Sequence, residues 1–272
     1  MTFDPFSLAF SDYELSDGQR WSTWPSIIPS QRGPRPWPDW LVTSAAAVDT
    51  ELGIVKTGKE ADVFLLERAV PDDPAQHSVL AAKRYRSPEN RNFHRSAAYE
   101  EGRRTRRSRD QRAIDQKTSY GRSVAAGHWA LAEFDALARL YGLGAPVPYP
   151  VQVNGTEILM EFLGRDGQAA PRLAQVRENP AALRDYLAQT EAILRVLAEA
   201  GLAHGDLSPY NLLVHDGRVM VIDLPQIVDV IANPNGLEFL HRDCVNIATW
   251  FERHRVECDA EELFAGLLGE IF

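Results

Sequence analysis

The sequence predicts an α+β protein with two lobes, a strand-rich N-terminal lobe and a mostly helical C-terminal lobe. Short apolar runs separated by a Gly-containing turn fill much of residues 53–85, a pattern typical of β-strands. Three stretches after residue 178 instead repeat apolar residues at the three- and four-residue spacing of helices. The chain of 272 residues with 44% hydrophobic content can bury two modest cores with a cleft between them.

Residues 1–48 are expected to form an accessory arm in front of these lobes. Prolines are interleaved with aromatic residues there, and this mixture cannot form a regular helix. Four of the six tryptophans lie in the arm: Trp21, Trp24, Trp37 and Trp40. We expect the arm to be extended and to pack its rings on the body, with docking of a partner as the alternative.

Residues 49–163 are expected to form the N-terminal lobe. The stretch Gly53–Leu66 has two apolar runs around a Gly-Lys turn, which predicts two strands and a loop. Val79–Tyr85 predicts a third strand, and this strand carries Lys83. Further on, Pro150–Val153 and Glu157–Glu161 predict two strands joined by an Asn-Gly hairpin turn.

A basic segment interrupts this lobe. Residues 84–122 contain twelve Lys or Arg and five Asp or Glu, in a chain whose net charge is −9. Residues 86–122 have few apolar side chains and little periodicity, so we expect much of this segment to be a mobile loop, with room for helical pieces. A helix is expected at 126–141, with Glu133 beside an apolar face made of Ala130, Phe134, Leu137 and Tyr141.

Residues 164–272 are expected to form the C-terminal lobe, after a link near Phe162–Gly167. Asn179 and Pro180 suit the cap and first position of a helix whose buried side carries Leu183, Leu187, Leu194 and Leu197. A second helix is expected at 235–253, with a stripe of Leu237, Leu240, Cys244, Ile247 and Phe251. A third is expected at 259–271, where Asp259 and Glu262 fit a capping box.

Asp206, Asn211 and Asp223 form a candidate reactive centre. The Asp-Gly pair at 216–217 separates two apolar runs and predicts a hairpin whose open end holds Asn211 and Asp223. Asp206 lies five residues before Asn211, so the three side chains converge. Carboxylate and amide oxygens are ligands that Mg²⁺ prefers, and a remaining carboxylate can orient or deprotonate a hydroxyl or water.

The stretch His204–Asn211 with Asp223 resembles the catalytic loop and metal-binding aspartate of the protein kinase superfamily. Three further stretches resemble the RIO family of atypical kinases and ATPases, most closely its first-described subfamily: Thr57–Phe64, Ile222–Gln226 and Leu237–Cys244. The resemblance runs from about residue 50 to residue 272. It implies a two-lobed protein-kinase-like fold.

The resemblance also implies roles for matching residues. Asp206 matches the catalytic aspartate, and Asn211 and Asp223 match the metal ligands; Asp223 also matches an aspartate that accepts a phosphoryl group transiently. Lys83 matches the lysine that holds the α- and β-phosphates, with Glu133 as its ion-pair partner. His204 is expected to brace the loop backbone.

The remaining implied residues contact ATP, with Mg²⁺ as the metal and Mn²⁺ as an alternative. They lie in the loop over the phosphates, in the hinge that meets adenine and in the catalytic loop: Thr57, Gly58, Lys59, Glu60, Val63; Met160, Glu161, Leu163; Ser208 and Tyr210.

The short stretch between Asp223 and the helix expected near Asn235 has no Ala-Pro-Glu motif or peptide platform. Peptide docking in the usual groove is therefore doubtful, and the resemblance to the RIO family implies Mg·ATP hydrolysis and serine autophosphorylation, as in a switch for ribosome or RNA-linked assembly. Phosphorylation of other proteins is left open. A small-molecule phosphotransferase of the aminoglycoside or choline type is the alternative enzyme, and a nucleotide-binding scaffold is the non-enzymatic alternative.

The charge pattern predicts where partners bind. The basic segment 84–122 is expected to contact an anionic partner, with a solvated mobile loop as the alternative. The resemblance to the RIO family implies that this partner is ribosomal RNA or a pre-ribosomal particle. We find no DNA-specific motif, no long apolar run for a membrane span and no secretory signal pattern. The two cysteines form no disulfide or metal pattern, so a cytoplasmic location is expected.

Overall fold

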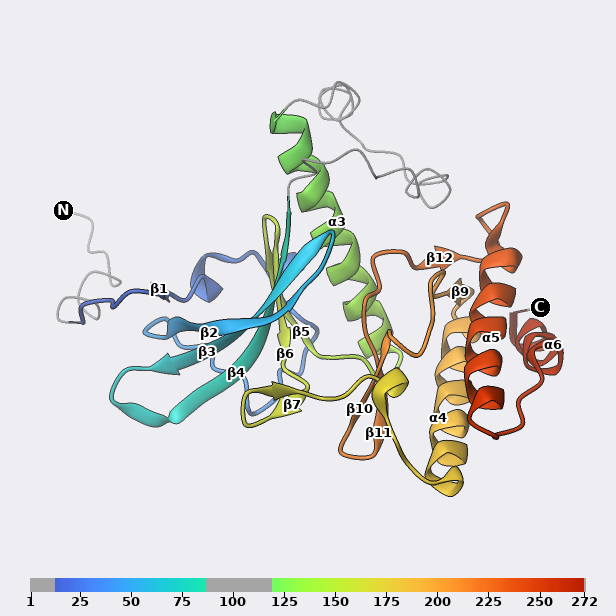
Figure 1. The fold of residues 1–272 in the computed structure, drawn as a ribbon. Helices are drawn as coiled ribbons and strands as arrows, with labels where there is room; N and C mark the ends of the chain where they lie inside the picture. Colours follow the sequence, from blue (N-terminus) through green and yellow to red (C-terminus); the bar gives the residue numbers. More distant parts are fainter. Residues whose placement is uncertain (1–12, 87–118, 272) are drawn as a thin grey trace.

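A six-stranded antiparallel sheet forms the N-lobe (Figure 1). The structure is a computed structural model that describes residues 13–86 and 119–271, with the backbone alone described for residues 119–123. The strand order is β1-β2-β3-β4-β6-β5. The strands are β1 (Gln19–Trp21), β2 (Val48–Thr57), β3 (Ala61–Val70), β4 (Asp73–Tyr85), β5 (Pro150–Asn154) and β6 (Glu157–Glu161). The strands predicted here are confirmed, but β2 and β4 begin earlier because their pairing extends through polar residues without apolar alternation.

The described part of the arm, residues 13–48, packs on the sheet, as expected, and reaches both of its edges. Strand β1 pairs with β2 at one edge, and Arg32 forms a bridge with Gln152 of β5 at the other. Between them lie two short 3₁₀ turns, η1 (Trp24–Ser26) and η2 (Pro29–Gln31). Trp24 is buried against one face of the sheet together with Leu41, Leu66, Leu80, Ala82, Tyr149, Val151 and Leu159.

A glycine allows this close approach at the β5 edge. The amide of Gly33 donates to Val151 O at 2.9 Å. A Cβ atom at this position would lie 1.9 Å from Pro150 O, so no other residue fits without moving the backbone. The arm is therefore an integral layer of the N-lobe.

Helix α3 (Ser119–Gly142) covers the opposite face of the sheet and continues into the C-lobe (Figure 1). Its first half packs Ala126, Ala130 and Phe134 on the sheet, while its second half adds to the C-lobe core. Residues 119–122 form its first turn, which is a helical piece at the end of the segment expected to be mostly loop. Tyr141, predicted to be buried, is 37% exposed because Leu140 fills the core side of that turn.

The C-lobe consists of helices around short hairpins (Figure 1). Its elements are β7 (Gly164–Arg165), β8 (Gln168–Ala169), η4 (Leu173–Gln175), α4 (Pro180–Glu199), β9 (Leu202–Ala203), β10 (Leu212–His215), β11 (Arg218–Val221), β12 (Val228–Asp229), α5 (Gly236–Arg253) and α6 (Ala260–Ile271). The predicted link near residues 162–167 contributes to the β7–β8 hairpin. None of the helices in the described ranges has both the length and the hydropathy that crossing a membrane requires.

The predicted Asn179 cap is present, and of the capping box predicted for Asp259 and Glu262 the contacts accepted by Asp259 are present. Asn179 Oδ1 accepts hydrogen bonds from the amides of Ala181 and Ala182 at 2.9 and 3.1 Å. Asp259 Oδ1 likewise accepts from the amides of Glu261 and Glu262. These contacts satisfy amides that have no partner inside the helix.

The stripe predicted for α5 is wrong at one position. Leu237 is exposed, whereas Leu240, Cys244, Ile247 and Phe251 are buried as expected. Leu237 lies in the first turn of the helix, where Phe239 turns toward the core instead.

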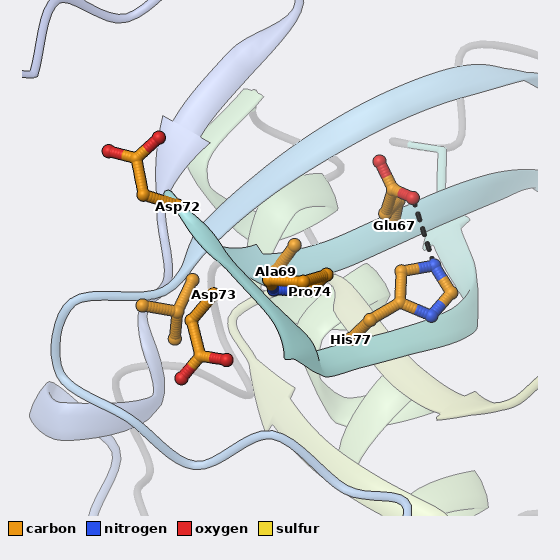
Figure 2. Close-up of a pocket in the computed structure, with 7 residues that line it drawn as sticks. Glu67, Ala69, Asp72, Asp73, Pro74 and His77 are labelled. Atoms are coloured by element: carbon orange, nitrogen blue, oxygen red, sulfur yellow. Dashed lines mark hydrogen bonds and ion pairs between the residues drawn. The ribbon is translucent and has the colours of Figure 1, made fainter.

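A shallow hollow lies at the β3–β4 turn (Figure 2). It is lined by Glu67, Ala69, Val70, Asp72, Asp73, Pro74 and His77. The ring of His77 and the carboxylate of Glu67 are 2.9 Å apart. None of these residues was predicted to be functional.

A buried ion pair stabilises the sheet beneath the arm. Arg68 on β3 donates to both carboxylate oxygens of Asp49 on β2, at 2.6 and 3.0 Å, and both side chains are fully buried. Arg68 also donates to Gln152, which in turn donates to Thr23 of the arm. The pair thus connects strands that are far apart in sequence.

Replacing Asp49 by alanine would leave the Arg68 charge buried without its carboxylate. We expect Asp49→Ala to lower the free energy of unfolding by about 3–5 kcal/mol, measured by urea denaturation. Asp39→Ala, at an exposed arm position, is the control and should change it by less than about 0.5 kcal/mol. A loss below about 1 kcal/mol for Asp49→Ala would contradict this view of the pair.

Candidate active site

The predicted hairpin forms at residues 212–221 and orients the candidate reactive centre. Strands β10 and β11 pair in antiparallel register, and the amide of Ile222 donates to Asn211 O at 3.0 Å. Asp216 and Gly217 both have positive φ, 49° and 76°, as a tight two-residue turn requires. Asn211 and Asp223 therefore lie at the same open end of the hairpin, as predicted.

Asn211 is held by the loop that precedes it. Its side-chain nitrogen Nδ2 donates to Asp206 O at 2.9 Å, and its amide donates to Ser208 O. Because Nδ2 makes this hydrogen bond, the side-chain oxygen Oδ1 is the Asn211 atom that could coordinate a cation. The side chain is buried, whereas Asp206 is exposed.

Lys83 joins both lobes at this point. Its Nζ lies 2.6 Å from Glu133 Oε1 of α3 and 2.8 Å from Asp223 Oδ1 of the C-lobe. Glu133 is 1% exposed, while the Asp223 side chain is 46% exposed. The predicted Lys83–Glu133 ion pair is confirmed, and Asp223 is a second partner that the sequence did not indicate.

The pKa values of Lys83 and Asp223 are both shifted at this contact. Burial alone would lower the pKa of Lys83, but the carboxylates of Glu133 and Asp223 outweigh it and raise that pKa above its usual value. Burial would raise the pKa of Asp223, but the Lys83 ammonium holds it below its usual value. Lys83 is therefore a permanent cation and Asp223 a permanent anion at neutral pH.

The loop between β2 and β3 lies over this centre. The amide of Gly58 donates to Ala61 O at 3.0 Å and closes the turn. Glu60 is exposed, and partial desolvation together with the nearby Asp223 carboxylate raises its pKa. Thr57 and Lys59 are exposed, and Val63 is half-buried on β3.

The other predicted ATP contacts flank the junction of the lobes. Met160 and Glu161 end β6, and Leu163 is buried beyond it. The Glu161 carboxylate accepts from the Tyr149 amide at 3.0 Å. Ser208 and Tyr210 belong to the catalytic-loop segment, and the Tyr210 side chain is 61% exposed.

Two cations that were not predicted also lie near this centre. Arg172 donates to Tyr210 O at 2.5 Å, which fixes it beside the loop. Burial lowers the pKa of Lys56 on β2, and the charge of Arg172 lowers it further. No motif singles these residues out, because their proximity exists only once the lobes are assembled.

Side chains of helix α5 hold the backbone of the loop at residues 204–211 in place. Asp243 is fully buried, and its two oxygens accept from the amides of Gly205 and Leu207, each at 2.8 Å. Asn246 donates to Leu207 O at 2.9 Å, and His204 Nε2 lies 3.1 Å from Ile222 O, which confirms the bracing expected of His204. Asp206 is thus carried between two backbone groups that α5 anchors.

Asp243 is an important residue for which no role was predicted from the sequence. It lies inside the apolar stripe of α5, between Leu240 and Ile247. A carboxylate on the buried face of a helix needs donors, and this signal could have identified it.

Comparison with known proteins places the chain in a family. Residues 76–263 match the family model described as RIO domain. The chain belongs to the RIO family. It is 38% identical over 224 residues to the RIO-type serine/threonine-protein kinase Rio1 of Haloferax volcanii, covering 82% of this chain and 70% of that relative. It is 30% identical over 238 residues to human serine/threonine-protein kinase RIO3, covering 85% of this chain but only 44% of the human protein.

Solved structures confirm the kinase-like fold of this RIO protein. The Rio2 kinase–ADP/Mg²⁺–phosphoaspartate complex from Chaetomium thermophilum superposes with a TM-score of 0.57 at 23% identity. The match covers 81% of this chain and 62% of that one. The predicted family, the two-lobed α+β fold and the kinase class are thus confirmed, whereas the domain boundaries and the roles of single residues stay predictions.

Removing one acceptor from Asp243 should loosen the loop that carries Asp206. We expect Asp243→Asn to lower the free energy of unfolding by about 1–3 kcal/mol. The side-chain NH₂ of asparagine would then face one of the two backbone N–H groups, and that N–H group would lose its acceptor. Hydrogen exchange of the Gly205 and Leu207 amides should accelerate. Glu238→Gln on the exposed face of α5 should change neither quantity. Unchanged exchange in Asp243→Asn would show that Asp243 does not hold the loop.

Proposed function

We propose that this RIO protein transfers the γ-phosphoryl group of Mg·ATP at the junction of its lobes. The observation that carries the proposal is the contact of Lys83 with Glu133 and Asp223, directly beside the Asp206–Asn211 loop. A fixed cation next to oxygen ligands and a free carboxylate supplies what phosphoryl transfer needs. Family membership supports the same reaction.

The residues present fit a magnesium ion. Asn211 Oδ1 and the Asp223 carboxylate would hold it, and bound Mg²⁺ would neutralise the phosphate oxygens. Among the described residues, no group of three or more His, Cys, Asp or Glu could hold a metal alone. The remaining ligands would thus be phosphate and water oxygens, as Mg²⁺ prefers; Mn²⁺ would accept the same donors.

Each remaining side chain has a place in this proposal. Lys83 would bind the α- and β-phosphates, and the β2–β3 loop would cover them. The exposed Asp206 would orient or deprotonate the attacking hydroxyl or water. The end of β6 would meet the adenine ring through Met160, Glu161 and Leu163.

We favour ATP hydrolysis with autophosphorylation over phosphorylation of other proteins. Residues 224–235 between Asp223 and α5 contain only the two-residue strand β12 and leave little chain for a peptide platform. Asp223 is a candidate phosphoryl acceptor, and the Rio2 kinase complex from Chaetomium thermophilum contains a phosphoaspartate. A role as a switch in ribosome assembly belongs to this proposal.

The proposed RNA contact concerns the basic segment, most of which lies outside the described residues. Arg84 and Arg86, which are described, already pair with carboxylates: Arg84 with Glu51 and Glu157, and Arg86 with Asp62. Any RNA contact would therefore depend on the arginines of residues 87–118.

Incubation with radiolabelled Mg·ATP tests the proposal. Purified protein should release phosphate and become labelled itself, and Asp206→Asn should lower both rates by at least about 100-fold. Asp223→Asn should do the same by weakening metal binding. Asp216→Asn, a matched change at the turn of the same hairpin, should leave them unchanged because Asn tolerates positive φ.

The chemistry of the label separates the acceptors. An acid-stable label indicates a serine or threonine ester, whereas a hydroxylamine-labile label indicates an acyl phosphate on aspartate. If the wild type releases no phosphate and acquires no label, the proposed function is contradicted. Labelling of an added aminoglycoside or choline in place of the protein would favour the small-molecule alternative.

A further inference from the structure

Tyr85 lies beside Lys83 on the face of β4 that α3 covers. The two residues are two positions apart on one strand, so their side chains share a face. Tyr85 is 7% exposed and packs with Ala130 and Phe134 of α3. The Lys83 ammonium lies 5.3 Å from the centre of the Tyr85 ring.

The Tyr85 hydroxyl completes the surroundings of Glu133. Its O–H donates a short hydrogen bond to Glu133 Oε2, while Glu133 Oε1 accepts from Lys83. Each carboxylate oxygen therefore has its own donor in a site where the Glu133 side chain is 2% exposed. A buried carboxylate oxygen without a donor is costly, so the hydroxyl favours this one orientation of Glu133.

Tyr85 itself is rigid and stays protonated. Its backbone is fixed in the sheet, where its amide donates to Thr156 O at 3.0 Å. Burial and the neighbouring Glu133 carboxylate raise the pKa of Tyr85 far above its usual value. The hydroxyl is thus a constant donor and not a proton acceptor.

We propose that Tyr85 is a positioning residue that holds Glu133, and through it Lys83, in place before nucleotide binds. This proposal rests on the proposed function in that it assumes that Lys83 binds the phosphates of the nucleotide. Its consequence is that α3 needs no inward movement to complete the site. Glu133 alone, a flexible side chain on a helix, would not hold Lys83 as firmly.

The first test uses the reactivity of Lys83 and needs no catalysis. Tyr85→Phe removes the hydroxyl but keeps the ring beside Lys83. The rate at which a small amine-reactive reagent modifies Lys83 is measured by peptide mass spectrometry without nucleotide. We expect a several-fold increase in Tyr85→Phe, approaching that of Glu133→Gln, because Lys83 is then less firmly held by Glu133.

Tyr149→Phe is the matched control. Tyr149 is also buried in the N-lobe, and its hydroxyl donates to Pro34 O at 2.8 Å, on the face of the sheet covered by the arm. This variant loses a comparable hydrogen bond, but its Lys83 should be modified at the wild-type rate. An unchanged Lys83 rate in Tyr85→Phe overturns the proposal.

The second test is a double-mutant cycle on kcat/KM for Mg·ATP. Tyr85→Phe should lower it about tenfold in the wild-type background, and by less than about twofold in the Glu133→Gln background. Equal losses in both backgrounds would show that Tyr85 acts on stability and not through Glu133. If the wild type has no activity, the proposed function fails, and the Lys83 modification rates still decide the role of Tyr85.

Discussion

The Lys83 ammonium, held between Glu133 and Asp223, is the contact on which the candidate site depends. Glu133 comes from α3 and Asp223 from the C-lobe, so one cation fixes three elements that are distant in sequence. Removing the Lys83 ammonium from water costs free energy. Attraction to two carboxylates, Glu133 and Asp223, offsets this desolvation cost better than attraction to one. Two carboxylates around one ammonium leave an excess negative charge. Under the proposed function, a metal ion held by Asp223 would offset this charge when an anionic triphosphate binds.

The remaining architecture holds the partners of Lys83 in place. Helix α3 packs its first half on the sheet and its second half in the C-lobe core, so it positions Glu133 relative to both lobes. In the C-lobe, Asp243 of α5 accepts hydrogen bonds from the backbone amides on either side of Asp206. The buried Arg68–Asp49 pair and the arm stabilise the sheet that carries Lys83. The two aspartates of the candidate centre, Asp206 and Asp223, are thus exposed or half-exposed, whereas Asn211, Glu133 and Asp243 are buried.

Features that depend on local sequence were predictable, and features that depend on tertiary contacts were not. The 216–217 turn brought Asn211 and Asp223 together because a hairpin fixes its own register. The Asn179 cap followed in the same way from neighbouring residues. By contrast, the buried role of Asp243 and the exposure of Tyr141 depend on which elements pack against each helix. Periodicity identifies the face of a helix but not the point along it where the neighbouring core ends.

The most direct measurement of the central claim is a crystal structure with Mg²⁺ and a non-hydrolysable ATP analogue. We predict that the metal binds between Asn211 and Asp223, and that Lys83 leaves Asp223 for the phosphates while keeping its contact with Glu133. A nucleotide bound elsewhere would contradict this claim. So would a complex in which Lys83 keeps its contact with Asp223 and no metal replaces it.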